Sequence, residues 1–383
     1  MSALPSRADV VVIGGGIIGT SVAFHLAEAG TRVCLLERAE LASGSTSRAA
    51  GGVRAQFSDP LNVAIGLRSI EAYERFRERP GAEIDLAQVG YLFLLDRAED
   101  VEVFERSVAL QNALGVASRF VSLAEARELC PLAGLEGVLA ATYCPRDGHA
   151  SPEAVVQGYA SGARSHGAAI VTRCAARSIV ERHGRVQGVD TDLGLVETDT
   201  VVCAAGVWSP ELVSPLDLDL PVQPVLREVA FTGPVASLPP RIPLTIDFST
   251  GFYFHREGPG LLFGMADREQ PPGLDAPTDP AWLERVLAVA ERRLPALADM
   301  PIAGGWKGAY EVTPDANALV GEAERPARLL YATGFSGHGF LQGPAIGEVV
   351  RDLVLRREPF VDISPLSAER FARGAPRPER HVV

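Results

Sequence analysis

The sequence of 383 residues contains a single lysine, Lys307, among 36 basic residues, so the other 35 are arginines. One explanation of the single lysine is a composition that favours arginine, with one lysine left by drift. The alternative is that this position needs a compact ammonium group, because burial can shift the pKa of a lysine. The formal net charge is −12, from 48 acidic and 36 basic side chains. Because nucleic-acid binding calls for a basic patch, we expect no nucleic-acid partner.

Cysteines and long apolar runs are also scarce. The five cysteines are odd in number, form no Cys-x-x-Cys pair and fit a reducing cytoplasm, and we expect no metal site. The opening residues MSALPSRAD lack the basic start and apolar core of a signal peptide. No uncharged apolar run approaches the ~18 residues of a membrane span, so we expect none. The cysteines are Cys34, Cys130, Cys144, Cys174 and Cys203.

What the chain does contain begins with a strand, a helix and a second strand. The run VVVIGGG is typical of a buried parallel strand, IIGTSVAFHLAEAG of a helix, and TRVCLLER of the next strand. The turn between the first two is Gly14-x-Gly16-x-x-Gly19, and Glu37 ends the second strand. Glycines allow close backbone approach, the helix start attracts a pyrophosphate, and the acid receives a ribose hydroxyl. We therefore predict dinucleotide binding, although this motif does not separate NAD from FAD.

Strand–helix pieces of the parallel type recur in the middle and at the end of the chain, and β-rich material interrupts them twice. We therefore expect an α/β chain, α+β overall, with a Rossmann-like dinucleotide-binding domain assembled from discontinuous segments. The second domain, for substrate, is expected to use a mainly antiparallel sheet. The dinucleotide-binding domain is assigned to 1–81, 150–224 and 325–366, and the substrate domain to 82–149 and 225–324. Residues 367–383 are assigned as a C-terminal tail, of which RGAPRPERHVV, residues 373–383, is expected to fray.

Three further segments have sequences that could contact the dinucleotide. In LASGSTSRAAGGVRAQF, residues 41–57, small and hydroxyl residues can follow an extended ligand, or they form an ordinary surface loop. In VVCAAGVWSPEL, a strand ends in residues small enough to lie against the dinucleotide, although packing alone also explains them. In YATGFSGHGFLQGPAIGEVV, a Gly-rich loop opens a helix whose N–H groups would face an anionic ligand atom such as reduced flavin near N1 and O2.

These motifs together resemble the D-amino-acid-oxidase-type flavoprotein superfamily. GSTSRAAGGVR, GWKGAYEVTPD and GFSGHGF are most similar to its branch of sarcosine oxidases, dimethylglycine dehydrogenases and proline dehydrogenase β-subunits. The resemblance extends to about residue 357. It implies FAD and an enzyme that oxidises an amine C–N bond to an imine, usually in an N-alkyl or cyclic amino acid.

The resemblance also implies roles for single residues. Arg54 matches the arginine that grips the substrate carboxylate, and Tyr253 and Tyr310 fall near substrate-side aromatics. His338 is either a general base or a loop-ordering histidine. The resemblance implies FAD contacts at Gly14, Gly16, Gly19, Glu37, Arg38, Ser45, Thr46, Gly337, His338, Gly339 and Phe340. We further predict cofactor contacts at Ile17, Ile18, Arg48, Ala49, Ala50, Gly51, Ala205, Gly206, Trp208, Gly308 and Gly334.

The chain departs from the family in three ways. Gly308 stands where some relatives tether FAD through cysteine, and Arg48 where others use histidine, so we expect noncovalent FAD. Leu262 stands where oxidases place a lysine that promotes reaction with O2, which favours a dehydrogenase over an oxidase. Leu341 likewise replaces a second carboxylate-binding lysine of some relatives.

The expected reaction is hydride transfer from the substrate carbon to flavin N5. Arg54 would bind the carboxylate through charge-assisted hydrogen bonds, and its field would favour the neutral amine. No dedicated base is then needed, and the sequence offers no obvious acid–base dyad.

Lys307 lies in GWKGAYEVTPD, where alternation places it on the face of Glu311 and opposite Tyr310. An ion pair with Glu311 is one interpretation. The neighbouring glycines also permit a bulge that would turn the lysine toward the flavin and make it catalytic.

Alternatives remain at this stage. The enzyme could instead be a D-amino acid or glycine oxidase, a subunit of a larger amine dehydrogenase complex, an NAD-linked dehydrogenase or an FAD enzyme for a hydroxy acid or polyol phosphate. Only one anion-gripping arginine is visible, which disfavours phosphate. The acceptor is O2 or another carrier, and partner subunits or a homo-oligomer stay open.

Overall fold

The computed structural model of this chain describes residues 3–267, 269–277 and 279–382. Its first layer is a six-stranded sheet in which every neighbouring pair except β18 and β19 is parallel. The strands are short, apolar and buried, as expected when helices cover a parallel sheet. In spatial order they are β18 (Leu319–Glu322), β19 (Leu329–Thr333), β12 (Val201–Cys203), β1 (Val10–Ile13), β2 (Val33–Glu37) and β8 (Ala169–Thr172).

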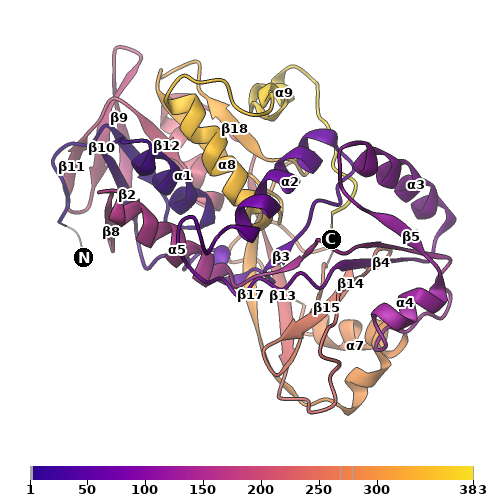
Figure 1. Cartoon of the computed structure of the whole chain (residues 1–383). Helices are drawn as coiled ribbons and strands as arrows, with labels where there is room; N and C mark the ends of the chain where they lie inside the picture. Colours follow the sequence, from indigo (N-terminus) through magenta and orange to yellow (C-terminus); the bar gives the residue numbers. More distant parts are fainter. Residues whose placement is uncertain (1–2, 268, 278, 383) are drawn as a thin grey trace.

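Helices cover one face of this sheet, and α1 lies between two others (Figure 1). Because α1 is enclosed by the sheet and by helices on both flanks, all of its residues but Glu28 are buried. Glycines permit the close approach of α8: a Cβ at Gly347 would lie 2.1 Å from the Ser21 hydroxyl oxygen. These helices are α1 (Ile17–Glu28), α2 (Pro60–Glu74), α5 (Pro152–Ser165) and α8 (Gly339–Val354).

A small antiparallel sheet packs its apolar side chains with the other face of the parallel sheet. It follows the order β11-β10-β9, with irregular register between β10 and β9. Its strands are β9 (Ala176–Arg182), β10 (Arg185–Thr191) and β11 (Gly194–Glu197), and the short helix α6 (Ser209–Val213) follows β12.

The second large sheet has eight strands and is antiparallel except where β14 runs parallel to β4. Three helices, α3, α4 and α7, belong to this half of the molecule (Figure 1). Its strands in spatial order are β17 (Ile302–Val312), β13 (Gln223–Thr232), β16 (Gly260–Met265), β15 (Phe252–Glu257), β14 (Leu244–Asp247), β4 (Tyr91–Leu95), β6 (Ala140–Cys144) and β5 (Arg119–Val121). The helices are α3 (Ala98–Ala113), α4 (Leu123–Leu129) and α7 (Trp282–Arg293).

The predicted fold class is confirmed: a parallel sheet with helices stands beside a mainly antiparallel sheet. The eight-stranded sheet draws its strands from both 82–149 and 225–324, which the sequence separates by the middle segment. A two-stranded ribbon of β3 (Gly52–Val53) and β7 (Gly148–His149) lies where the halves meet.

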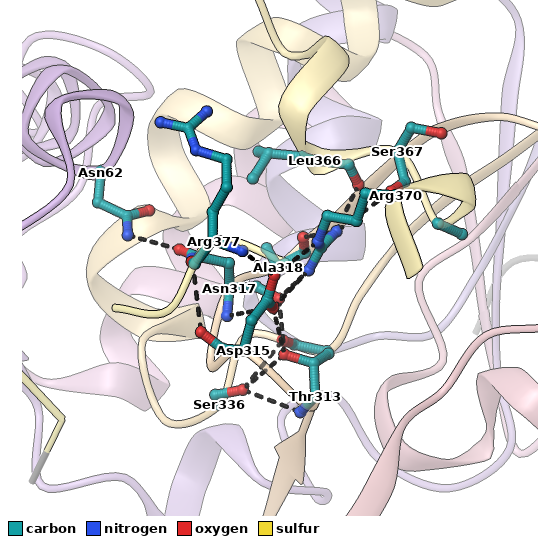
Figure 2. Close-up of polar contacts among 12 residues, drawn as sticks. Asn62, Thr313, Asp315, Asn317, Ala318, Ser336, Leu366, Ser367, Arg370 and Arg377 are labelled. Carbon is teal, nitrogen blue, oxygen red and sulfur yellow. Dashed lines mark hydrogen bonds and ion pairs between the residues drawn. The ribbon is translucent and has the colours of Figure 1, made fainter. Parts of the chain in front are cut away.

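The expectation that residues 373–383 fray is wrong for their described part, 373–382, where Glu379 and His381 are buried. After α9 (Glu369–Ala372), the chain passes α2 and ends beside α3 (Figure 1). Arg370 is buried and makes a two-bond ion pair with Asp315, at 2.8 Å for each bond (Figure 2). Such a buried and fully hydrogen-bonded pair, invisible in the composition of the segment, holds the tail in place.

Candidate active site

A cavity of about 810 Å³ is lined by residues of both large sheets. One end is lined by the turn after β1, the end of β2 and the loop after β12. The other end is lined by side chains of β4, β13, β15 and β17. The cavity therefore joins the predicted dinucleotide-binding motif to the predicted substrate side.

The glycine turn after β1 is built for close backbone approach. Gly14 adopts φ of +113°, and a Cβ there would lie 2.3 Å from the Ala204 carbonyl oxygen. Glu37 fixes the turn, because its carboxylate accepts from the Gly15 N–H at 2.7 Å and from the Ala39 N–H at 2.8 Å. Gly19 lies outside the cavity wall and instead lets α1 pack on the turn, since a Cβ there would overlap the Gly14 carbonyl.

Residues 43–52 cross from the dinucleotide end to β17. Thr46 accepts the Ile17 N–H at 3.2 Å through its hydroxyl, which ties the segment to the first turn of α1. Ser45 donates from its hydroxyl to the Ala309 carbonyl at 2.6 Å. At Gly308 a Cβ would lie 2.8 Å from that of Arg48, so the close crossing requires glycine. This segment lines the cavity and is bound to α1 and β17, so it is not an ordinary surface loop.

Two further walls complete the dinucleotide end. The guanidinium of Arg38 lies over the indole of Trp208, 3.7 Å from the ring centroid, and both residues line the cavity. The start of α8 faces the cavity through Gly339, Phe340 and Leu341, with Gly337 at φ of +93° just before it. Gly334 lies outside the wall and donates its N–H to Glu311.

Glu311 is a cavity residue that sequence reasoning treated only as a possible partner of the lysine. Its carboxylate accepts from the Thr333 hydroxyl at 2.8 Å and from the Gly334 N–H at 2.9 Å. Desolvation in the cavity wall raises the pKa of this carboxyl group, and the two hydrogen bonds partly oppose that rise. The acidic side chain faces the strand–loop–helix segment, which a sequence pattern could not show.

Arg54 lies at the substrate end, 4% exposed. Its Nη2 donates to the His381 carbonyl at 2.6 Å and lies 3.3 Å from Nε2 of His338, while Nη1 donates to the Gln56 carbonyl. The Phe57 ring lies 4.3 Å from the guanidinium carbon. Arg54 is thus a buried cation whose strongest contacts are with the protein.

His338 is buried directly before α8, and its ring meets Phe57 edge-on at 5.1 Å. Burial, together with the neighbouring Arg54 cation, holds the pKa of the imidazole far below its ordinary value, so the ring is neutral. Its Nε2 faces an Arg54 N–H, which requires that nitrogen to be the acceptor. This arrangement fits the loop-ordering interpretation better than the general-base one.

Three tyrosines surround the substrate end, and one of them was missed. Tyr253 and Tyr310 line the cavity as expected, and Tyr91 of β4 lines it as well. Desolvation raises the pKa of all three phenols, so they stay neutral hydrogen-bonding groups at neutral pH. Tyr91 lies in a buried strand run, YLFLL, whose tyrosine is indistinguishable from an ordinary core residue by pattern.

Arg227 of β13 is the second arginine at the substrate end, which corrects the expectation that Arg54 alone stands there. It lines the cavity, its guanidinium carbon lies 5.6 Å from the Tyr310 ring centroid, and its Nη1 donates to the Asp267 carbonyl at 2.9 Å. Alternating strands give no signal that distinguishes a cavity-facing arginine from a solvent-facing one.

Lys307 is not in the cavity wall. β17 is regular around it, and the register pairs Lys307 with Glu228 of β13, whose carboxylate lies 3.4 Å from the ammonium. The flavin-facing interpretation is therefore wrong. The ion-pair interpretation is right in kind, but the predicted partner Glu311 is engaged elsewhere. The lysine side chain is 47% exposed.

The other predicted positions fall as follows. Leu262 is buried in β16 and does not line the cavity, whereas Leu341 does. Within the described residues no cluster of three or more His, Cys, Asp and Glu side chains could hold a metal ion, and no helix could cross a membrane. The remaining predicted FAD-binding positions that line the cavity are Gly16, Ile17, Ile18, Ala49, Ala50, Gly51, Ala205 and Gly206.

A glycine turn between strand and helix that opens onto a cavity lined by tyrosines and arginines is typical of enzymes that bind a dinucleotide next to a small substrate. The family model "FAD dependent oxidoreductase" matches residues 9–353. The chain belongs to this D-amino-acid-oxidase-type family of FAD-dependent oxidoreductases.

Known proteins similar to the chain agree with this assignment. Mitochondrial dimethylglycine dehydrogenase of Mus musculus is 31% identical over 96% of the chain, which covers 44% of that protein. Glycine oxidase of Geobacillus kaustophilus is 30% identical over 95% of the chain and 97% of that protein. The crystal structure of L-proline dehydrogenase from P. horikoshii superposes with a TM-score of 0.93 at 32% identity, covering 98% of the chain and all of that structure. The chain spans less than half the length of the first curated relatives.

Proposed function

We propose that the protein oxidises the C–N bond of a secondary, tertiary or cyclic amino acid to an imine, with FAD as the hydride acceptor. The supporting observation is the single cavity that connects the Gly14 turn to Arg54, Tyr253 and Tyr310. Relatives named for dimethylglycine, 4-methylaminobutanoate and proline support the substrate class.

The residues present fit FAD. Without a Cβ, Gly14 packs closely on the Ala204 backbone, and the Glu37 carboxylate fixes the turn that lines the cavity. The Ser45–Gly51 segment, Trp208 and the start of α8 would line the rest of the cofactor. The bound flavin would supply the hydride acceptor.

The protein side chains would bind and orient the substrate. The buried cations at the substrate end favour a neutral amine, so that its lone pair is available without a dedicated base. The neutral phenols of Tyr253 and Tyr310 can donate to the substrate, and the neutral His338 fixes Arg54. The apolar floor of Leu244 and Ile246 excludes water from the reacting carbon.

We further propose noncovalent FAD, because Gly308 and Arg48 offer neither a thiol nor an imidazole at the two tethering positions. Denaturation in acid should release all the flavin into the supernatant, and a fluorescent protein band on a denaturing gel would contradict this. The same proposal includes a dehydrogenase preference, because leucine stands at position 262, which the family resemblance assigns to the lysine of oxidases. It is tested by comparing O2 with an artificial acceptor.

We also propose a division into two domains. Residues 1–81, 150–224 and 325–366 would bind FAD, and residues 82–149 and 225–324 would bind the substrate. Supporting this division, the six-stranded sheet comes from the first set apart from β18 (Leu319–Glu322), and the eight-stranded sheet comes from the second set apart from the first two residues of β13 (Gln223–Thr232). Five buried free cysteines support a reducing cytoplasmic location.

Anaerobic flavin bleaching tests the function directly. Sarcosine, N,N-dimethylglycine, L- and D-proline, glycine and D-alanine are added in turn to the purified holoenzyme. Reduction by an N-alkyl or cyclic amino acid is expected, and failure of every amine would reject the proposal. Preferential reduction by glycine or D-alanine would instead establish the alternative, an amino acid oxidase or dehydrogenase, which the glycine oxidase relatives support.

A further inference from the structure

We propose that the substrate carboxylate binds to Arg227, and that Arg54 is a positioning cation held in place by the C-terminal segment 377–382. This inference rests on the proposed function and names the group that recognises its substrate class. It reverses the assignment that the sequence alone suggests, in which Arg54 makes the carboxylate contact.

The hydrogen bonds of Arg54 are already committed. A guanidinium binds a carboxylate through two parallel N–H groups, and each of its two forked edges includes a hydrogen of Nη2. Both hydrogens of Nη2 face protein acceptors, the His381 carbonyl at 2.6 Å and Nε2 of His338 at 3.3 Å. A two-bond carboxylate contact with Arg54 would therefore require one of these partners to leave.

His381 is held firmly enough to make that exchange unfavourable. Its ring is fully buried and stacks on Phe104 of α3, with centroids 4.3 Å apart and an angle of 12° between planes. Two residues earlier, the buried Glu379 carboxylate accepts from the Ser58 hydroxyl at 2.6 Å and from the Asn62 amide at 2.9 Å. The backbone N–H of Glu379 donates to the Asp315 carbonyl at 3.0 Å.

The segment is anchored again further back. Asp315 binds the Arg370 guanidinium with both carboxylate oxygens and also accepts the Arg377 N–H at 3.0 Å (Figure 2). Asn317 donates from its amide to the Arg377 carbonyl and accepts from Asn62 at 2.6 Å. The network fastens the segment to the loop between β17 and β18 and to α2, so the His381 carbonyl is a fixed acceptor.

Arg227 has the opposite character. Its Nη1 donates to the carbonyls of Leu226 and Asp267, whereas its buried Nε has no hydrogen-bond partner within the part of the chain that the structure describes. The forked edge formed by Nε and Nη2 thus includes a buried donor that has no protein acceptor among the described residues. Since a buried donor without a partner is costly, this edge is suited to a ligand carboxylate.

The surrounding charges point the same way. The charge of Arg54 is offset by the carboxylates of Glu379 and Asp147. Near Arg227 the described carboxylate is that of Asp267, which is 2.8 Å from Arg285 and in an ion pair with it. Arg227 is therefore the less compensated of the two cations, and an anionic ligand would complete its environment.

The test separates the two arginines with a matched pair of ligands, acetate and acetamide, which differ in charge but little in shape. Binding to the holoenzyme is measured by calorimetry and by the perturbation of the flavin spectrum. Arg227→Gln is expected to weaken acetate binding by roughly 10- to 100-fold, the effect of losing charge-assisted hydrogen bonds, and to leave acetamide binding unchanged. Arg227→Lys keeps the charge but not the two parallel N–H groups, so its affinity for acetate is expected to lie between those of the wild type and Arg227→Gln.

Arg54→Gln is expected to retain the preference for acetate over acetamide. Arg256→Gln serves as the matched control, since Arg256 lies in the same sheet, bonds to the Gly258 and Pro239 carbonyls and does not line the cavity. Flavin content and melting temperature identify misfolded variants. Loss of the acetate preference in Arg54→Gln, with its retention in Arg227→Gln and Arg227→Lys, would overturn the inference.

The outcomes also separate this inference from the proposed function. If acetate binding depends on Arg227 but no amine reduces the flavin, the carboxylate site stands and the amine reaction fails. If sarcosine or proline reduces the flavin and the Arg227 variants keep the wild-type Kd for acetate, the reaction stands and this inference fails.

Discussion

Arg54 donates a hydrogen bond of 2.6 Å to the backbone carbonyl of His381, a residue 327 positions further along the chain. The contact joins the segment after β3 to the described end of the chain, at the substrate end of the cavity. Because the acceptor is a main-chain carbonyl, the hydrogen bond depends on where the C-terminal segment 377–382 lies and not on the side chain of residue 381. The position of the segment in turn depends on Glu379 and Asp315.

Glu379→Gln is expected to loosen this segment. The carboxylate accepts from three backbone N–H groups, a hydroxyl and an amide, and replacing it with a neutral amide places an N–H where an acceptor is needed. We expect unfolding free energy to fall by about 1–3 kcal/mol, measured by urea denaturation of the holoenzyme. Glu369→Gln is the control, because Glu369 forms an exposed pair with Arg373 and should lose less than about 1 kcal/mol. Equal losses in both variants would contradict the anchoring role.

Asp147 is expected to make stability fall as pH rises. It is buried, and burial raises the pKa of its carboxyl from 3.8 to about 6, although Gln56 and the Ala55 N–H donate to it. A raised native pKa means that the folded state holds the proton more tightly than the unfolded state. Its contribution to stability therefore declines between pH 4 and 6, by up to about 1.4 kcal/mol per pH unit.

The variant Asp147→Asn lacks this titration and serves as the reference. The difference in unfolding free energy, wild type minus variant, should decrease from pH 4 to 6 and then level off, as measured by urea denaturation at each pH. A difference that increases over this range would show that Asp147 is stabilised in its charged form.

Gly14→Ala is expected to abolish FAD retention. The residue combines φ of +113° with an approach that would put a Cβ 2.3 Å from the Ala204 carbonyl oxygen. Gly30→Ala is a matched control, because φ there is +87° but nothing lies within 4 Å of a Cβ. It should cost only about 1 kcal/mol of backbone strain and keep the flavin. The ratio of flavin to protein absorbance after gel filtration distinguishes the two, and flavin retention by Gly14→Ala would exclude close packing at the turn.

Lys307→Met is expected to act on stability alone, and slightly. The ammonium pairs with Glu228 at a partly exposed position, and such pairs contribute about 0.2–1 kcal/mol. Thermal unfolding should show a small decrease, and stopped-flow rates of flavin reduction and reoxidation should match the wild type. A large loss in either rate would restore a flavin-side role for this lysine.

Local patterns determined a great deal about this protein. Hydrophobic periodicity and glycine positions within short stretches were enough to predict three features. These are the Gly14-x-Gly16-x-x-Gly19 turn between strand and helix, the acidic residue Glu37 and the discontinuous strand–helix segments. The family segments around Arg54 and Gly308 led from these patterns to FAD and to an oxidoreductase.

The tertiary structure decided which distant side chains meet. Cross-strand register, not spacing along one strand, pairs Lys307 with Glu228. The fold of β13 brings Arg227 to the cavity, and Asp315 draws the final segment back to Arg54. None of these contacts has a periodic signal, because each joins residues from separate elements, and the energy of a buried charge depends on partners that only the folded chain assembles.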